Sequence, residues 1–161
     1  MTKINSRAKG STFERQIAAD LRAWLGDGWT VTRAQTDRQR GQAADGHAGE
    51  FVIEHGALSF PWAIECKAHA RLDLRQLWRA PVDGPLPGWW MQTVRQARAV
   101  RREPLLVVKV ARGETLAVLR PGLELHGPML TGALLGEELV IVRWAAMGEP
   151  VRAVSVGEVR A

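Results

Sequence analysis

Phe60-Pro61-Trp62-Ala63-Ile64-Glu65-Cys66-Lys67 has the composition of a buried strand that ends with two charged side chains. Successive side chains of a strand point to opposite faces, so residues two apart share a face. We therefore expect Ile64 and Cys66 to enter a core, and Glu65 and Lys67 to emerge together on the other face. A carboxylate and an ammonium side by side at the end of an apolar strand indicate a chemically useful site.

The two charged side chains suit metal-assisted chemistry on a phosphate. A carboxylate such as Glu65 can hold Mg²⁺, a hard cation that prefers oxygen ligands. The ammonium of Lys67 can orient or deprotonate an attacking water and offset charge on the phosphate. Metal-assisted hydrolysis of a phosphodiester needs several anionic oxygens around the ion. We therefore expect a second acid, either Glu50 or Asp45, and a third in Glu14 on the first helix.

The surrounding sequence predicts an α/β fold. Apolar residues recur at helical spacing before Leu25, and the strand candidates either alternate or are continuously apolar. The turn signal His55-Gly56 predicts a hairpin between the strands on either side of it. The expected elements are a helix from Ser11 or Thr12 to Leu25, strands at 29–33, 50–54 and 60–67, a helix at 89–102 and a central strand at 105–111.

The remaining segments predict loops and further strands. We interpret 35–49 as a mobile loop, 71–79 as a short helix and 81–88, with three prolines and two glycines, as a loop. Strands are expected at 116–119 and 139–144. The predicted architecture is a sandwich with a mixed central β-sheet flanked by helices over residues 1–112. Residues 113–161 form a β-rich C-terminal extension, of unknown role, in the same globular unit.

Four segments in order make the chain resemble the phage and prophage branch of the PD-(D/E)XK nuclease superfamily, which includes proteins similar to Holliday junction resolvases. An E-x-K tripeptide alone carries little weight, whereas four segments in the expected order carry much more. They fall within roughly residues 6–112 and are Ser6-Arg7-Ala8-Lys9-Gly10 with Phe13-Glu14-Arg15, Ala48-Gly49-Glu50-Phe51-Val52, the segment from Phe60 to Lys67, and Trp90-Met91-Gln92 with Pro104-Leu105-Leu106-Val107-Val108-Lys109.

The resemblance implies a restriction-endonuclease-like core and Mg²⁺-dependent hydrolysis of DNA phosphodiesters. Carried over by position, Glu65 is a metal ligand and Lys67 is the catalytic lysine. Glu14 matches the acidic residue of the first helix that supports the metal or its waters. Gln92 matches a polar residue on the helix after the core hairpin, close to the site.

The sequence departs from the family pattern at the first acid. The family usually has an aspartate after a glycine at the start of a strand, whereas here Gly49 is followed by Glu50. Asp45 has the usual residue type but lies in the preceding loop. We favour Glu50 as the first metal ligand and keep Asp45 as the alternative. Mn²⁺ accepts the same carboxylate oxygens as Mg²⁺, so the ligand types do not decide between the two ions.

Composition places the chain among soluble globular proteins. The hydrophobic fraction of 46% suits a packed core, and no apolar run approaches the ~20 residues needed to span a bilayer. The N-terminus has no apolar region typical of a secretory signal. Cys66 is the one cysteine, so no intramolecular disulfide can form. We expect a cytoplasmic protein, in the host cell if it is phage-encoded, with no membrane partner.

The charge distribution permits a polyanionic partner, and the resemblance implies that this partner is DNA. The net charge is +5, and residues 1–112 hold 18 Lys and Arg against 11 Asp and Glu. Arg95, Arg98 and Arg102 recur at i, i+3 and i+7, a spacing that could follow a phosphate backbone, although a solvated helix face would look the same. The candidate DNA-binding residues are Lys9, Arg33, Arg38, Arg40, Arg95, Arg98 and Arg102.

Two functional alternatives stay open on the sequence. Symmetric cutting of a branched junction would need two active sites and hence a homodimer, whereas a nuclease for linear or single-stranded DNA would not. In the other alternative, a degraded nuclease core only binds DNA. A requirement for divalent metal separates the enzyme from the pure binding module.

Overall fold

The computed structural model describes residues 6–34, 49–56, 58–69, 84–110, 113–125 and 127–155. The helix predicted at 71–79 lies outside these residues. So does most of the loop predicted at 35–49, including Arg38, Arg40 and Asp45.

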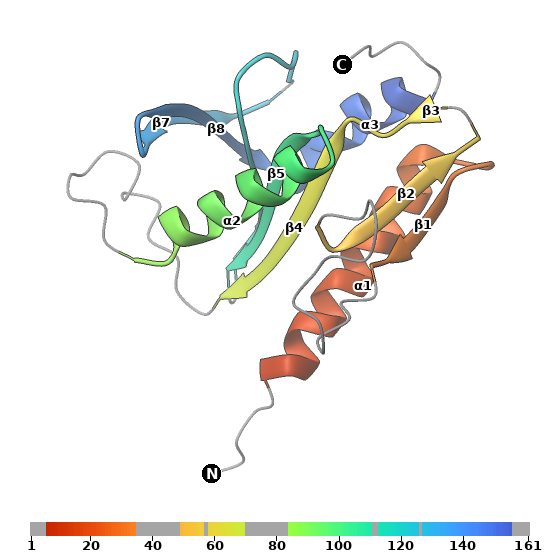
Figure 1. Cartoon of the computed structure of the whole chain (residues 1–161), viewed down its shortest axis with the longest axis horizontal. Helices are drawn as coiled ribbons and strands as arrows, with labels where there is room; N and C mark the ends of the chain where they lie inside the picture. Colours follow the sequence, from red (N-terminus) through yellow and green to blue (C-terminus); the bar gives the residue numbers. More distant parts are fainter. Residues whose placement is uncertain are drawn as a thin grey trace.

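Within the described ranges the strands form two sheets (Figure 1). The smaller is antiparallel, in the order β1 (Thr30–Arg33), β2 (Phe51–His55), β3 (Leu58–Ser59). The larger is mixed, in the order β4 (Trp62–His69), β5 (Glu103–Val110), β6 (Thr115–Leu119), β8 (Glu137–Arg143), β7 (Met129–Leu134). Only β4 and β5 pair in parallel there, with Glu65 opposite Leu106. The predicted class, a mixed sheet flanked by helices, is confirmed.

Helices cover both faces of the larger sheet. α1 (Ser6–Leu25) packs on one face through a core that includes Ile64, Cys66 and Val107, while α2 (Leu86–Ala99) packs on the other face over Leu106 and Val108. β5 is therefore buried on both faces, as its continuous apolar run predicted. After a short 3₁₀ helix at Trp144–Met147, α3 (Gly148–Ser155) packs beside α1.

The predicted hairpin between 50–54 and 60–67 is wrong. The turn after His55 does form, but it pairs β2 with the two-residue strand β3. The chain then passes through Phe60 and Pro61 and enters the other sheet as β4, which pairs with β5. Proline has no backbone N–H to donate to a ladder, so Pro61 ends pairing with the first sheet.

The helix boundaries also differ from the prediction. α1 begins at Ser6, so Ser11 and Thr12 lie inside the helix and do not cap it. α2 covers Leu86–Ala99, and the last three residues of the loop predicted at 81–88 are therefore its first turn, where proline is tolerated. The helix ends before Arg102, whose predicted place on the helix face with Arg95 and Arg98 is wrong.

The residues after 112 extend the sheet of the preceding segment. β6 pairs with β5 across the predicted division at residue 112, and β8 and β7 continue the same sheet. The chain also contains α3, which the sequence did not predict. Trp144 ties this part to α1, because its indole N–H donates to Asp20 Oδ2 at 2.9 Å and its ring lies 4.9 Å from that of Trp24.

The two sheets meet where Gly49 and Glu50 pass along the edge of β4. The N–H of Glu50 donates to the carbonyl oxygen of Ile64 at 2.7 Å. Gly49 has φ +94, and a Cβ added there would lie 2.5 Å from that same oxygen. Only glycine fits this backbone conformation and this close approach.

We expect Gly49→Ala to destabilise the fold through both effects. The positive φ alone costs an alanine about 1–2 kcal/mol, and the contact with Ile64 O adds to that cost. Gly56→Ala is the matched control, since Gly56 has φ +50 but open space around an added Cβ. Urea unfolding of both variants measures the difference. Equal losses in the free energy of unfolding would show that the close approach contributes nothing.

Stability should also fall at high pH because of Cys66. Burial raises the pKa of the Cys66 thiol well above its ordinary value, and the nearby carboxylates of Glu50 and Glu65 raise it further. In the unfolded chain the thiol has a pKa of about 8.5. Above that pH the unfolded thiol has lost its proton, while the folded protein still keeps it. The free energy of unfolding should decrease as pH rises above that value. Unfolding curves from pH 7 to 10 should show this decrease in the native protein and a smaller one in Cys66→Ala.

Candidate active site

The strand β4 presents Glu65 and Lys67 on the face that α2 covers. Lys67 Nζ donates to Glu65 Oε1 at 2.5 Å, and Gln92 Nε2 on α2 donates to the same oxygen at 2.9 Å. Ile64 and Cys66 point to the opposite face and join the core under α1. The alternation predicted from the sequence is therefore confirmed, and the structure adds the contact with Gln92.

Glu65 is a buried charged residue, with 2% of its surface exposed. Removing a carboxylate from water is costly unless charges or hydrogen bonds compensate for it. Lys67 and Gln92 supply this compensation, but both act on Oε1. Within the described residues, no hydrogen bond reaches the other oxygen, Oε2. A free oxygen on a buried carboxylate is suited to a cation.

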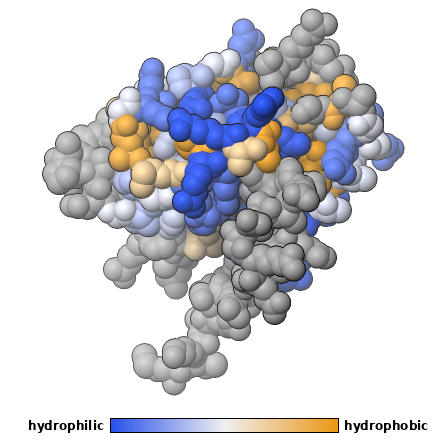
Figure 2. Space-filling view, viewed as in Figure 1, coloured by the Kyte–Doolittle hydropathy of each residue, from blue (hydrophilic) through white to orange (hydrophobic). Residues whose placement is uncertain are grey.

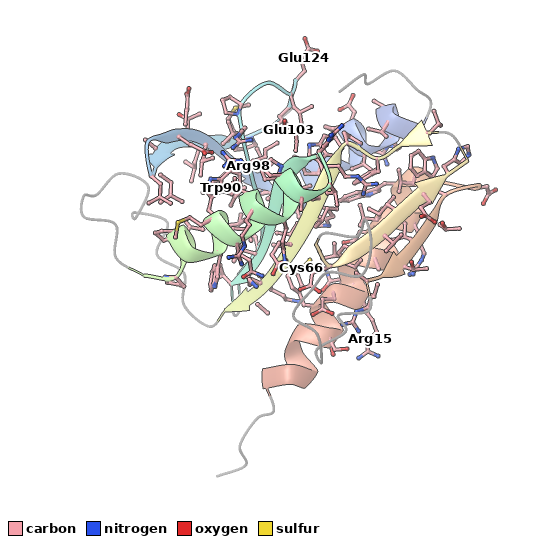
Figure 3. All side chains as sticks on the ribbon, in the orientation of Figure 1. Arg15, Cys66, Trp90, Arg98, Glu103 and Glu124 are labelled. Carbon is pink, nitrogen blue, oxygen red and sulfur yellow. The ribbon has the colours of Figure 1, made fainter. Side chains whose placement is uncertain are left out.

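Glu50 is held next to this strand by its own backbone. Its N–H donates to Ile64 O, one residue before Glu65. The electrostatic surroundings of Cys66 agree with this placement, since Glu50 and Glu65 both raise the pKa of its thiol while Lys67 lowers it. Figure 3 places Cys66 on the ribbon of β4. The structure thus brings the backbone of Glu50 beside β4, the strand that carries the other predicted acid, Glu65.

The described acids alone do not form a complete metal-binding site. No group of three or more His, Cys, Asp and Glu side chains that could hold a metal occurs among those residues. Glu50 and Glu65 are the two predicted metal ligands that the structure describes. Asp45, the alternative first acid, lies outside the described residues.

Glu14 is engaged by an arginine. Its Oε2 forms an ion pair with Arg33 Nη2, and Arg33 Nη1 donates to Ser11 Oγ at 3.2 Å. This pair joins α1 to β1. Arg33 also lowers the pKa of Cys66, so it lies in the same electrostatic neighbourhood as the acids. The sequence grouped Arg33 with the DNA-binding residues and missed its partner, because the two residues are 19 positions apart on different elements.

The other predicted DNA-binding residues are spread along two helices and a turn. Arg95 and Arg98 are exposed on α2, while Arg102 is partly buried in the turn before β5. Lys9 lies on α1, and its side chain is outside the described part of the structure, as are Arg38 and Arg40. None of the described helices has the length and apolar content that a bilayer-spanning segment needs.

The chain matches a known protein family over most of its length. Residues 5–126 match the family described as "phage putative PDDEXK endonuclease". No curated protein matches the chain. Among solved structures, Hjc from Archaeoglobus fulgidus, a Holliday junction resolvase of an archaeal hyperthermophile, aligns over 88% of this chain and 99% of its own, with 15% identity and a TM-score of 0.43.

The family match confirms the resemblance that the four sequence segments indicated. It covers most of the chain and includes the segments that carry Glu14, Glu50, Glu65, Lys67 and Gln92. This protein therefore belongs to the phage putative PDDEXK endonuclease family.

Proposed function

We propose that this protein is a metal-dependent endonuclease that hydrolyses DNA phosphodiesters at the site formed by Glu50, Glu65 and Lys67. One observation carries the proposal. Glu65 is a buried carboxylate whose Oε1 is held by Lys67 and Gln92, while its Oε2 accepts no hydrogen bond from the residues that the structure describes. A fold gains no stability from burying a carboxylate that is only partly compensated, so function is the better explanation for its presence.

In this proposal each side chain has its own task. Glu50 and Glu65 hold Mg²⁺, or Mn²⁺ with the same oxygen donors. The bound ion would supply Lewis acidity and neutralise charge on the phosphate. Lys67 orients or deprotonates the attacking water, and Gln92 fixes the rotamer of Glu65 through its hydrogen bond at 2.9 Å.

Glu14 has a supporting role in the same proposal. Its carboxylate holds Arg33, whose positive charge acts on Cys66, the residue next to Glu65. Asp45 remains the alternative to Glu50 as the first metal ligand. The basic residues of α2, Arg95 and Arg98, are exposed and contact the flanking DNA.

The substrate that we propose is branched DNA of phage recombination or replication. The family name supports an endonuclease from phage, and four-way junctions are the substrate to examine first. Cutting both strands of such a junction symmetrically would require a homodimer with two sites. The reaction would take place in the cytoplasm of the host cell, where replicating phage DNA is found.

Strand cleavage by the purified protein tests the proposal. The substrates are a labelled four-way junction, linear duplex and single-stranded DNA, each with Mg²⁺, Mn²⁺ or EDTA. We expect cutting with metal and none with EDTA. Glu65→Gln and Lys67→Met should each lower the rate by about a hundredfold or more while DNA binding persists. Their matched controls are Glu138→Gln and Lys109→Met, which remove the same charges elsewhere on the larger sheet and should keep the rate.

Two results would contradict the proposal. If the protein binds DNA but cuts no substrate with either metal, the chain is a binding module on a nuclease scaffold. If it cuts, and the rate is indifferent to Glu65→Gln and Lys67→Met, the active site lies elsewhere. Preference for the junction over linear duplex would support the branched substrate, whereas equal rates would argue for a general nuclease.

A further inference from the structure

A groove of about 400 Å³ lies between α2 and the turn that joins β7 to β8. Trp90, Met91, Val94 and Leu135 give it an apolar lining. Arg95 and Arg98 add positive charge at its rim. Figure 2 shows hydrophobic and strongly hydrophilic residues side by side on the face that carries α2, and Figure 3 places Trp90 and Arg98 on that helix.

The turn beside the groove holds an apolar residue in an unfavourable conformation. Leu135 and Gly136 form the two-residue connection between β7 and β8, with φ of 54 and 82. Such turns favour asparagine, aspartate or glycine at both positions, because positive φ is unfavourable for other side chains. Leu135 is nevertheless 53% exposed, so burial does not compensate. An apolar side chain kept exposed at the cost of its backbone indicates a binding role.

The charges at the groove favour an anionic partner over a second protein surface. Arg95 and Arg98 form no ion pair with any residue that the structure describes. The one acid that lines the groove, Glu137, is already bound by Arg120 through both of its oxygens and by the indole N–H of Trp90. Two arginines buried against another protein without acidic partners would be costly. A phosphate backbone would supply the missing charges.

The helix geometry links this groove to the active site. Successive residues of a helix turn by about 100°, so Gln92, which contacts Glu65, and Val94, which lines the groove, lie on opposite flanks of α2. Arg95 and Arg98 lie about 60° and 120° from Gln92, in the direction of Val94 around the solvent side. The two arginines therefore form a positively charged path from the active-site flank to the groove.

The path bends tightly around α2, and this bend favours unpaired DNA over duplex. An α-helix with its side chains is about 10–12 Å across. Duplex DNA has a persistence length of about 50 nm and cannot turn round a single helix. A single strand can do so, and its bases can leave the stack and pack on apolar side chains while its phosphates contact arginine.

We propose that the groove binds an unpaired segment of the substrate strand. The strand leaves the active site past Gln92 and crosses α2 with its phosphates on Arg95 and Arg98. It then places a base against Met91, Val94 and Leu135. This inference rests on the proposed nuclease function, since it takes its direction from the active site. It makes DNA with an unpaired tail or an opened branch a better ligand than blunt duplex.

Leu135→Asn gives the sharpest test, because stability and binding should change in opposite directions. Asparagine suits the positive φ, so the unfolding midpoint should rise by about 2–4 °C. The apolar contact is lost, so affinity for a duplex with a single-stranded tail should fall about tenfold. Fluorescence anisotropy in EDTA measures both 5′-tailed and 3′-tailed DNA against blunt duplex, whose affinity should not change. Leu58→Asn, at an exposed leucine on β3, is the matched control and should change neither affinity.

The arginines are tested by the salt dependence of the same binding. Replacing both Arg95 and Arg98 with glutamine should reduce the slope of log affinity against log salt by about 1.4 for tailed DNA, at about 0.7 per phosphate contact in a single strand. Arg143→Gln, at an exposed arginine on β8, should leave the slope as it is.

Three outcomes would overturn the inference. If Leu135→Asn binds both tailed ligands with wild-type affinity, the proposed base contact is wrong. If the double arginine variant keeps the wild-type salt slope, the proposed phosphate path is wrong. Loss of a dimer in Leu135→Asn, with DNA affinity unchanged, would make the groove an interface between two copies. The proposed function fails separately: tail-dependent binding without metal-dependent cleavage would contradict the nuclease and leave the groove assignment standing.

Discussion

A backbone hydrogen bond joins the two sheets, and the candidate site depends on it. The N–H of Glu50 donates to Ile64 O, and this contact is possible because Gly49 has no side chain where a Cβ would collide with that oxygen. The bond fixes the start of β2 along the edge of β4. It thereby holds the backbone of Glu50 beside Ile64, the residue before Glu65. Backbone packing thus requires a glycine before Glu50, and this packing brings Glu50 close to the strand that carries Glu65.

Burial of Glu65 is the second constraint, and it involves both helix and strand. A carboxylate with 2% exposure needs compensating partners, and these come from the same strand through Lys67 and from α2 through Gln92. The site therefore depends on the packing of α2 over β4 and β5. Trp90, two residues before Gln92, is buried in that packing and is also tied to Glu137 on β8. The residues after 112 accordingly take part in positioning α2.

The helix α2 combines four surfaces in 14 residues. One side is apolar and packs on the sheet. One flank faces the strand that carries Glu65, and the other flank borders the groove with Leu135. The exposed side carries Arg95 and Arg98 without acidic partners among the described residues. The spacing of the arginines alone could not distinguish a solvated helix face from a phosphate path, because the two have the same periodicity.

The sequence by itself determined the local features of this protein. The period of two in β4 put Glu65 and Lys67 on one face, and the continuous apolar run of β5 marked the strand buried on both sides. These features are fixed by backbone geometry, which any strand must obey. The order of four short segments was enough to indicate the family, which the match to residues 5–126 confirmed.

Only the tertiary structure decided which elements meet. The sequence favoured a hairpin between neighbouring strands, whereas β4 pairs with β5, some 40 residues later in the chain, and Glu50, just before β2, donates a backbone hydrogen bond to β4. The pairing of Glu14 with Arg33, across 19 positions, was equally hidden, whereas the resemblance had placed Gln92 close to the site and only its bond to Glu65 was new. The physical reason is that periodicity tells which side of an element is apolar, but not which of several apolar partners will cover it. That choice is made by packing over the whole chain.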